Sequence, residues 1–467
     1  MVRAPLTRWL VACFSTGLIL SVPVTAQQGH TEQSHNMALV GYHDLQGRPA
    51  YQPEIVQQGD RWIAYIGLIG GKIMNEVTGE IEANGTLIVD VTDPRNPLTL
   101  SHITGSADEA NREGSGAQMN RVCTISGKLY LLRSFGSSRQ ELWEVTNPRE
   151  PQFLVNVADD IDSVHKNWWE CDTGIAYVVV GDKDWRSRYT RIYDLSDPAH
   201  PRLIRNYGIP GQQPGSTIEP VPTDLHGPIV LGNRVYFGYG SSRDGHIQIV
   251  DRDKLLNGAA EASVENLESP EISRYNLAPN HGAHTVFPVL GVPVADYRDN
   301  AEGGTRDFLI VPSESTRNEC LESRDVVLIL DITIPQQPIG VSSYQVRESV
   351  GDFCQRGGRF GPHAVNESIN PMYYKKIVFV SYFNAGVRAV DIRDPFRPQE
   401  VGFYIPATTA QTTPSCLMVD GDRRCKTAVQ TNNVEIDDRG FIYIVDRNST
   451  GMHILELTGE AKAISSM

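Results

Sequence analysis

Short apolar and β-branched runs recur along the chain, and each ends in a similar polar turn. Five copies read TLIVDVTDP (86–94), LWEVTNP (142–148), RIYDLSDP (191–198), VLILDITIP (327–335) and VRAVDIRDP (387–395). Such runs are typical of β-strands, and a proline that follows Asp or Asn ends the strand in a turn. Asp90, Asp194, Asp331 and Asp391 are therefore interpreted as strand-end and turn residues, with calcium binding as the lesser alternative.

A second, Tyr-rich run precedes each of these signatures, as at 62–67, 128–132, 174–180 and 234–239. A further segment before it would form an innermost strand, which gives four strands in each unit. Helical periodicity is nearly absent. Repeated four-stranded units are typical of a β-propeller. We count seven blades, which begin near residues 50, 117, 162, 222, 281, 360 and 428; six or eight blades are the alternatives.

The last unit ends after three strands, at residues 452–457. Residues 36–42 (NMALVGY) have the pattern of a strand and could supply the missing outer one. Pairing of the two chain ends would close the ring and remove an open sheet edge. The sequence therefore predicts an all-β domain over 36–467, a seven-bladed β-propeller closed by an N-terminal strand.

The repeated Ile-Val-Asp and Thr-Asp-Pro signatures resemble those of the LVIVD-repeat family of exported bacterial β-propellers. The resemblance covers most of the chain after residue 26. It implies the fold and export, but little about chemistry, because fold alone does not define function.

Residues 1–26 have the layout of a secretory signal, with Arg3 and Arg8 ahead of an apolar run and a Val24-Thr-Ala26 cleavage pattern. A short segment, 27–35, would separate the signal from the propeller. The chain is predicted to be periplasmic or secreted. No later apolar run is long enough for a membrane span, and a net charge of −14 disfavours nucleic acid as a partner.

Six cysteines follow the signal, and an even number in an exported chain favours disulfides. Cys416 and Cys425 flank a polar stretch that resembles a closed loop, so they are the first predicted pair. Cys320–Cys354 is the second. Cys123–Cys171 is the third, and buried free thiols are the alternative for all of them.

Alignment of the blades on the Tyr-rich run places a polar residue near the start of every innermost strand. Blades 3 to 6 each place a histidine there: His165, His226, His284 and His363. Imidazole is a common ligand of Fe, Cu and Zn. Histidines from neighbouring blades would converge on the propeller axis, so we predict that they hold one transition-metal ion. A water-filled polar channel and metal-free acid/base chemistry are the alternatives.

Further residues are predicted to support this site or to line its pocket: Glu54, Glu170, Glu435, Trp168, Trp169, Arg359 and His281. The glutamates would orient the imidazole rings. The tryptophans could form a pocket wall or fill space between blades, and Arg359 could face an anionic substrate at the channel mouth. In the other blades the corresponding candidates are Gln52, Gln118, Asn120, Arg121, Asn432 and Asn433.

Two classes of function are compatible with this pattern. The first is an exported metal-dependent enzyme, an oxidoreductase or a lyase or hydrolase, that acts on a small organic molecule in a narrow central pocket. The second is a non-catalytic scaffold that binds proteins of the cell envelope. A scaffold needs no ring of histidines, which favours the enzyme.

Overall fold

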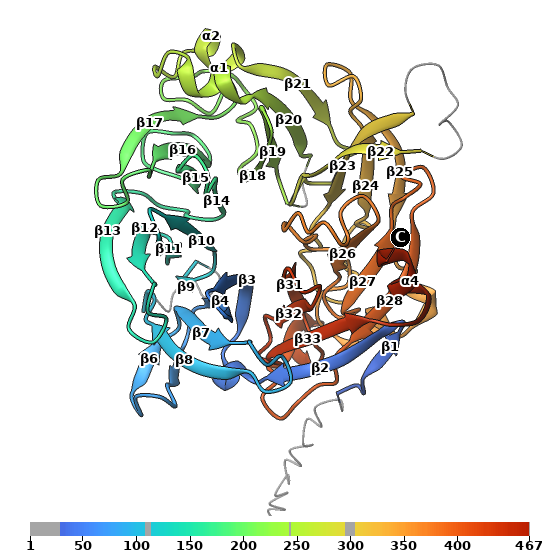
Figure 1. The fold of residues 1–467 in the computed structure, drawn as a ribbon. Helices are drawn as coiled ribbons and strands as arrows, with labels where there is room; N and C mark the ends of the chain where they lie inside the picture. The colour runs from blue at the N-terminus through green and yellow to red at the C-terminus, as the bar shows by residue number, and fades with distance from the viewer. Residues whose placement is uncertain (1–28, 108–113, 242–243, 295–303, 467) are drawn as a thin grey trace, which may run out of the picture.

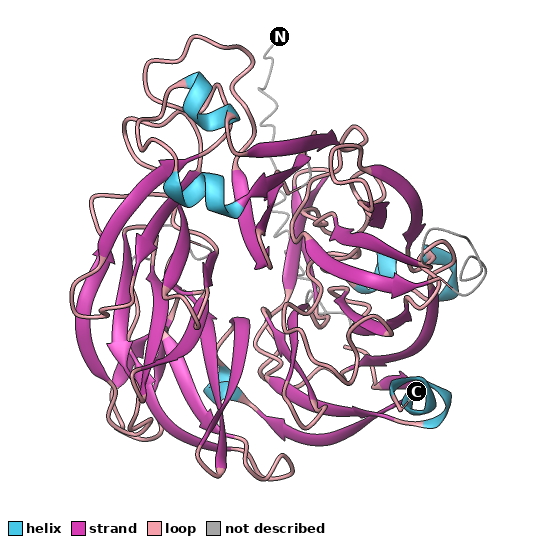
Figure 2. Cartoon of the chain, turned by 45° about the horizontal axis from the view of Figure 1, so that its top comes forward, coloured by secondary structure: helices cyan, strands magenta, loops and turns pink. Residues whose placement is uncertain are grey.

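The computed structural model describes residues 29–107, 114–241, 244–294 and 304–466; the predicted signal, 1–26, lies outside them. Within these ranges seven antiparallel sheets are arranged in a ring (Figure 1). The sheets carry nearly all of the regular structure, and the helices are short and peripheral (Figure 2). The predicted seven-bladed β-propeller is confirmed.

Blades 1 to 4 each contain four strands that follow one another in the sequence from the axis outward. Their strands are β3 (Ala50–Gln58), β4 (Arg61–Ile69), β7 (Thr86–Asp90) and β8 (Leu98–Ile103) in blade 1; β10 (Asn120–Ile125), β11 (Lys128–Phe135), β12 (Arg139–Glu144) and β13 (Gln152–Ala158) in blade 2; β14 (Asn167–Trp169), β15 (Ile175–Val180), β16 (Tyr189–Asp194) and β17 (Arg202–Tyr207) in blade 3; and β18 (Leu225–Leu231), β19 (Arg234–Tyr239), β20 (His246–Asp251) and β21 (Glu271–Asn276) in blade 4.

Blades 5 to 7 complete the ring. Their strands are β22 (Phe287–Pro293), β23 (Thr305–Pro312), β24 (Val327–Asp331) and β25 (Ile339–Tyr344) in blade 5; β26 (Ile377–Ser381), β27 (Val387–Asp391), β28 (Gln399–Ile405) and β1 (Gln33–His35) in blade 6; and β31 (Thr431–Ile436), β32 (Ile442–Asp446), β33 (Met452–Leu457) and β2 (Met37–His43) in blade 7. The innermost segment of blade 6 is irregular. It pairs with its sheet at the bridge from Val365 to Val380 and through a few further backbone hydrogen bonds.

Shorter elements decorate the ring. They are β9 (Gly116–Ala117), the hairpins β5 (Lys72–Met74) with β6 (Ile81–Ala83) and β29 (Ser415–Val419) with β30 (Asp422–Lys426), and the helices α1 (Arg252–Asn257), α2 (Val264–Glu268), α3 (Phe353–Arg356) and α4 (Gly459–Ser465). In the ranges that the structure describes, no helix combines the length and apolar character needed to cross a membrane.

The repeated aspartates end their strands as predicted. The Oδ1 atoms of Asp90, Asp194, Asp331 and Asp391 each accept a 2.9 Å hydrogen bond from the backbone N–H two residues later. This local bond fixes the start of the turn between the third and fourth strands. The conformation explains the repeated Asp without a bound ion.

The third and fourth strands of every blade are joined through a β-bulge at a corresponding position. In three blades the residue after the bulge is a serine whose hydroxyl donates to a proline carbonyl in the turn of the next blade: Ser101 to Pro148, Ser273 to Pro335 and Ser342 to Pro395. Apolar side chains from neighbouring blades also pack together, such as Leu132, Val178 and Phe237. The repeat therefore specifies both the blade and its contact with the next one.

The N-terminal segment closes the ring. Strand β2 pairs antiparallel with β33 and becomes the outer strand of blade 7, which confirms the predicted closure. The segment also contributes β1, which pairs with β28 at the edge of blade 6. The sequence did not predict this second strand. Strands β1 and β2 thus join two adjacent blades (Figure 1).

All three predicted disulfides are present. Cys416–Cys425 joins β29 to β30 across one hairpin, and Cys123–Cys171 joins β10 of blade 2 to the turn before β15 of blade 3. Cys320–Cys354 joins the loop after β23 to α3. Disulfides are typical of proteins that fold in an oxidising environment.

One buried histidine outside the centre makes stability depend on pH. His453 on β33 is 6% exposed, and burial lowers its pKa to about 3. The unfolded chain therefore takes up a proton below pH 6.5 that the folded chain does not, so stability falls as pH drops from 6.5 toward 3. At pH 5 this one group should cost about 2 kcal/mol. A His453→Phe variant should lose less stability than the wild type between pH 7 and pH 5 in denaturant titrations; parallel pH dependences would contradict this account.

Candidate metal centre

Four histidines converge at the propeller axis, as predicted from their places in the blades. His165, His284 and His363 precede the first regular strand of their blades, and His226 occupies a bulge within β18. The backbone N–H groups of His165, His284 and His363 donate to carbonyls of Val179, Pro312 and Ser381, which lie near the ends of the second strands. Because the three histidines make the same type of backbone bond, their imidazoles lie at the same height along the propeller axis.

The four rings form a continuous row around the axis. Ring centroids are 4.4 Å apart for His165 and His226, 3.8 Å for His226 and His284, and 4.1 Å for His284 and His363. The Nε2 atoms of His165 and His226 are 2.7 Å apart. At that distance either one ring donates a proton to the other or both face one cation. His226, His284 and His363 are buried, while His165 is partly open to the pocket.

A carboxylate that the sequence did not predict joins the row. Glu314, in the loop between β23 and β24, has an oxygen 4.0 Å from His284 Nε2 and another 3.7 Å from His363 Nε2. Ligand atoms of His226, His284 and Glu314 all lie within 4.8 Å of one another. Two imidazoles and one carboxylate are a common protein donor set for Zn²⁺ and Fe²⁺.

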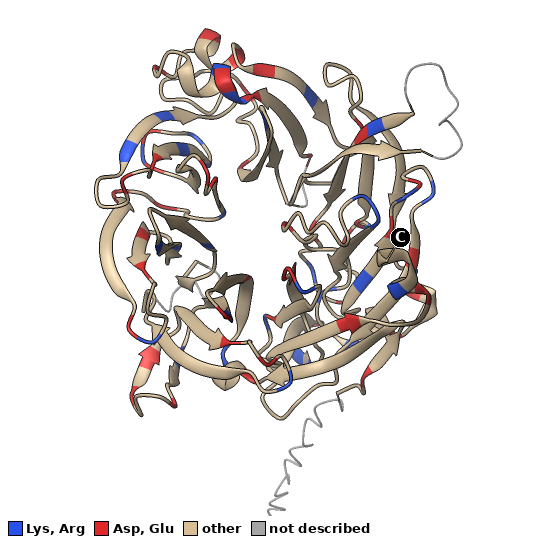
Figure 3. Cartoon of the chain, viewed as in Figure 1, with Lys and Arg blue, Asp and Glu red and all other residues tan. Residues whose placement is uncertain are grey.

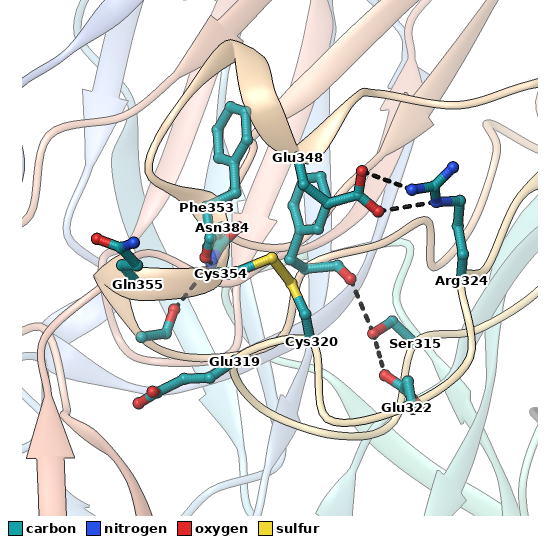
Figure 4. The surroundings of a disulfide bond; sticks show 12 residues. Ser315, Glu319, Cys320, Glu322, Arg324, Glu348, Phe353, Cys354, Gln355 and Asn384 are labelled. Carbon is teal, nitrogen blue, oxygen red and sulfur yellow. Dashed lines mark hydrogen bonds and ion pairs between the residues drawn. A yellow bond between two sulfur atoms is a disulfide. The ribbon is translucent and has the colours of Figure 1, made fainter.

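The loop that carries Glu314 is anchored to the segment before His363. The Ser315 hydroxyl donates to the Phe360 carbonyl at 3.1 Å, and the Ser315 N–H donates to the Pro362 carbonyl at 3.1 Å. The disulfide between Cys320 and Cys354 lies near Ser315 (Figure 4). The Ser315 bonds and the disulfide thus join the loop that carries Glu314 to the segment that leads to His363.

Two imidazole nitrogens of the row lack partners. His363 Nδ1 lies 2.6 Å from the Asn432 carbonyl and His284 Nδ1 lies 3.3 Å from the Thr285 hydroxyl. Among the described residues, His226 Nδ1 and His284 Nε2 are buried and have no hydrogen-bond partner. A buried polar atom without a partner costs about 1–3 kcal/mol. The row is thus an incomplete polar cluster that a cation would complete.

Electrostatics keep the rings neutral. Burial lowers the pKa of His165, His226 and His284 well below the usual value, and the cationic side chain of Lys166 lowers it further for all three. Arg188 has the same effect on the pKa of His165 and His226. Burial also lowers the pKa of His363, to about 3. Neutral imidazole is the form that binds metals, so these rings need no deprotonation near neutral pH.

A second, charged layer is buried near the histidines, and its Lys166 acts on their pKa values. The Glu367 carboxylate accepts from both Arg121 and Lys166, and all three side chains are at most 8% exposed. Arg121 also donates to Glu54 at 2.9 Å. Glu435 accepts from the backbone N–H groups of Glu367 and Ser368, and burial together with the nearby Glu367 and Glu54 raises its pKa to about 7. Charged positions thus occur on the innermost segments of the blades as well as on the outside (Figure 3).

The other predicted residues lie in several environments. Arg359 donates to Glu314 at 3.0 Å, so it belongs to the cluster. Trp168 lies against the Arg121 guanidinium, and the Trp169 indole donates to the Gly174 carbonyl. Glu170 pairs with Arg252, and the His281 ring contacts the carbonyls of Pro279 and Arg324. Glu54, Glu435 and Arg359 make their contacts at the centre of the ring. Trp169 and His281 make theirs within their own blades, and Glu170 contacts α1 of the next blade.

A polar pocket of about 290 Å³ borders the row of histidines at His165. Its lining combines starts of innermost segments with loops that join second to third strands. The lining includes Tyr51, Gln118, His165, Ser137, Arg188, Ser241, Glu314 and Arg447. The Tyr51 hydroxyl lies 3.4 Å from His363 Nε2, so Tyr51 of blade 1, rather than Gln52 or Glu54, occupies the position next to the histidines. A ligand in this pocket could contact the His165 imidazole, the Tyr51 phenol and the guanidinium groups of Arg188 and Arg447 at once.

Comparisons with known proteins show similarity in fold only. No protein-family model and no curated protein matches the chain. Among solved structures, Sqt1 of Chaetomium thermophilum aligns with a TM-score of 0.49 and 8% identity over 90% of this chain and 98% of that one. Hydrazine synthase of Kuenenia stuttgartiensis aligns at 0.47 and 10% identity over 88% and 96%, and a putative 6-phosphogluconolactonase of Bacteroides fragilis at 0.47 and 10% over 83% and 88%.

Proposed function

We propose that this protein is a metal-dependent enzyme that acts on a small organic molecule at the mouth of its central channel. His226, His284 and Glu314 would hold the ion, and His165 and His363 flank it. The observation that carries the proposal is the pair of buried nitrogens without partners, His226 Nδ1 and His284 Nε2, inside a cluster that already includes a carboxylate.

The donor set favours a first-row transition metal over a hard cation such as Ca²⁺ or Mg²⁺, because imidazole nitrogen predominates. Zn²⁺ and Fe²⁺ fit two histidines and a carboxylate, and additional imidazoles also suit Cu²⁺. Such an ion would supply Lewis-acid or oxygen-activating chemistry.

The protein's own groups would bind and orient the substrate. The pocket borders His165, which is partly open, and Tyr51, whose hydroxyl can donate to a bound oxygen. The Asn432 carbonyl accepts from His363 Nδ1 when that nitrogen carries the proton, and so fixes its ring. Arg359 holds Glu314 in place through a 3.0 Å bond. A confined pocket beside a fixed donor set favours catalysis on a small molecule over binding of a protein surface.

We also propose that the chain is exported and belongs with the LVIVD-repeat propellers. Three disulfides support an oxidising location, and the repeated strand-end aspartates support the kinship. The predicted signal segment remains a prediction.

The proposal is tested by metal analysis of the protein purified after expression with Fe, Cu and Zn supplied. The wild type should carry about one ion per chain, and His226→Ala, His284→Ala and Glu314→Gln should each reduce that content at least tenfold. His200→Ala is the matched control, because His200 is an exposed ring paired with Asp197 on an outer turn; it should retain the ion. Metal-free wild type, or variants that keep the full content, would favour the scaffold.

A further inference from the structure

The pocket that borders the histidines is rich in arginine. Arg188 and Arg447 line it, and Arg359 lies beside it on Glu314. These three side chains come from blades 3, 7 and 6, so they surround the pocket rather than form a patch on one surface. One carboxylate, Glu314, lies among them in the described lining, and Arg359 already pairs with it. The pocket is therefore cationic even before an ion is added.

Arg188 is available to a ligand. Its Nε atom is buried and has no hydrogen-bond partner among the described residues. The nearest carboxylate, that of Asp224, lies 4.0 Å from this nitrogen and its side chain is 54% exposed, so it neutralises Arg188 weakly. The Arg188 side chain lines the pocket and is 21% exposed, and a guanidinium is suited to bind an oxyanion in a forked geometry.

Burial acts in the same direction at both arginines. It lowers the pKa of Arg188 and of Arg447, since removing water from a guanidinium disfavours its charged form. Their charged state would be stabilised by an anion in the pocket. Although the chain has a net charge of −14, these two partly buried cations both line the pocket that borders His165.

We infer that the substrate is a small organic carboxylate whose anionic group is bound by Arg188 and Arg447 while the rest of the molecule faces His165 and Tyr51. This inference deepens the proposed function. It rests on that function because it treats the bound molecule as a substrate, whereas the anion site itself needs no metal. The pocket volume of about 290 Å³ restricts the ligand to a few carbon atoms beyond the carboxylate.

Binding of succinate to the intact protein, after removal of metal with a chelator and its dialysis, tests the anion site alone. Calorimetry should detect succinate, while the neutral succinamide should bind at least tenfold more weakly. Arg188→Gln should weaken succinate binding about 10- to 100-fold, as expected for loss of a charge-assisted hydrogen bond. Arg188→Lys should recover only part of the loss, because it restores charge without the fork.

Arg202→Gln is the matched control, since Arg202 is 69% exposed and pairs with Asp194 on the outside of blade 3. Equal affinity for succinate and succinamide, or unchanged binding by Arg188→Gln, would overturn the inference. If inorganic phosphate bound tightly and in preference to succinate, the inferred substrate would be a phosphate ester and the carboxylate inference would be wrong. Because these measurements use metal-free protein, they test the anion site independently of the metal site. Succinate binding can be found even if metal analysis finds no ion, and an ion can be found even if succinate does not bind.

Discussion

Glu367→Gln is expected to destabilise the protein by about 3–5 kcal/mol, among the largest effects of any single substitution in the channel. The Glu367 carboxylate lies between two buried cations, Arg121 and Lys166, and accepts from both. Although burial raises the pKa of Glu367, the two cations outweigh it and keep the pKa below its ordinary value. A neutral amide would leave two buried positive charges with less counter-charge, and burial of uncompensated charge is costly.

Denaturant titration of Glu367→Gln against Glu144→Gln measures this effect. Glu144 pairs with Lys128 at 2.9 Å on the surface, where the lysine is 56% exposed, so the same change there should cost less than about 1 kcal/mol. Equal losses of stability in the two variants would contradict this account, because they would show that the buried charged layer does not support the channel more than a surface ion pair does.

Gly41→Ala is expected to cost about 3 kcal/mol, because it disrupts the seam that closes the ring. Gly41 follows the bulge in β2, at the position that Ser101, Ser273 and Ser342 occupy in other blades. A β-carbon at Gly41 would lie 1.8 Å from the Pro94 carbonyl oxygen of blade 1. That neighbour is backbone, so β2 itself would have to move away from the next blade.

Gly340→Ala provides the matched control in the outer strand of blade 5. The nearest atom to its added β-carbon would be the Tyr275 hydroxyl, 3.2 Å away at the end of a movable side chain. The control should unfold within about 1 kcal/mol of the wild type. A Gly41→Ala variant as stable as Gly340→Ala would show that the ring does not depend on close contact between blades 7 and 1.

Much of the fold could be predicted because the repeat encodes it locally. The strand-end aspartates and the prolines specify one turn per blade, and bonds such as Asp90 Oδ1 to the Thr92 N–H confirm their role. Strand β1 could not be predicted, because three exposed residues with little apolar character give no strand signal. Its place depends on the open edge of β28, which exists only in the assembled ring.

The histidines could be located because they share a position relative to the Tyr-rich strands. Glu314 could not be located in this way, because it lies in a loop between the second and third strands and an alignment of the first strands does not include those loops. A signal did exist: Ser137, Ser241 and Glu314 each lie two residues after the second strand of their blades, which end at Phe135, Tyr239 and Pro312. An alignment on the ends of those strands would have placed these residues at the same mouth.

Two members of the charged layer, Lys166 and Glu367, could not be predicted from alternation along strands. Lys166 follows His165 directly and would point away from the axis in a regular strand. Both residues precede β14, however, so the alternation rule does not apply, and Lys166 reaches Glu367. Glu367 itself lies in the irregular inner segment of blade 6, for which local sequence gives no register.

The central claim is that imidazoles from adjacent blades and one carboxylate hold a single ion. X-ray diffraction data collected on either side of the absorption edge of the metal found by elemental analysis would locate that ion directly. The account predicts one anomalous peak, about 2.0–2.2 Å from ligand atoms of His226, His284 and Glu314. A metal-loaded crystal with no peak between these residues, or with its peak elsewhere in the chain, would contradict it.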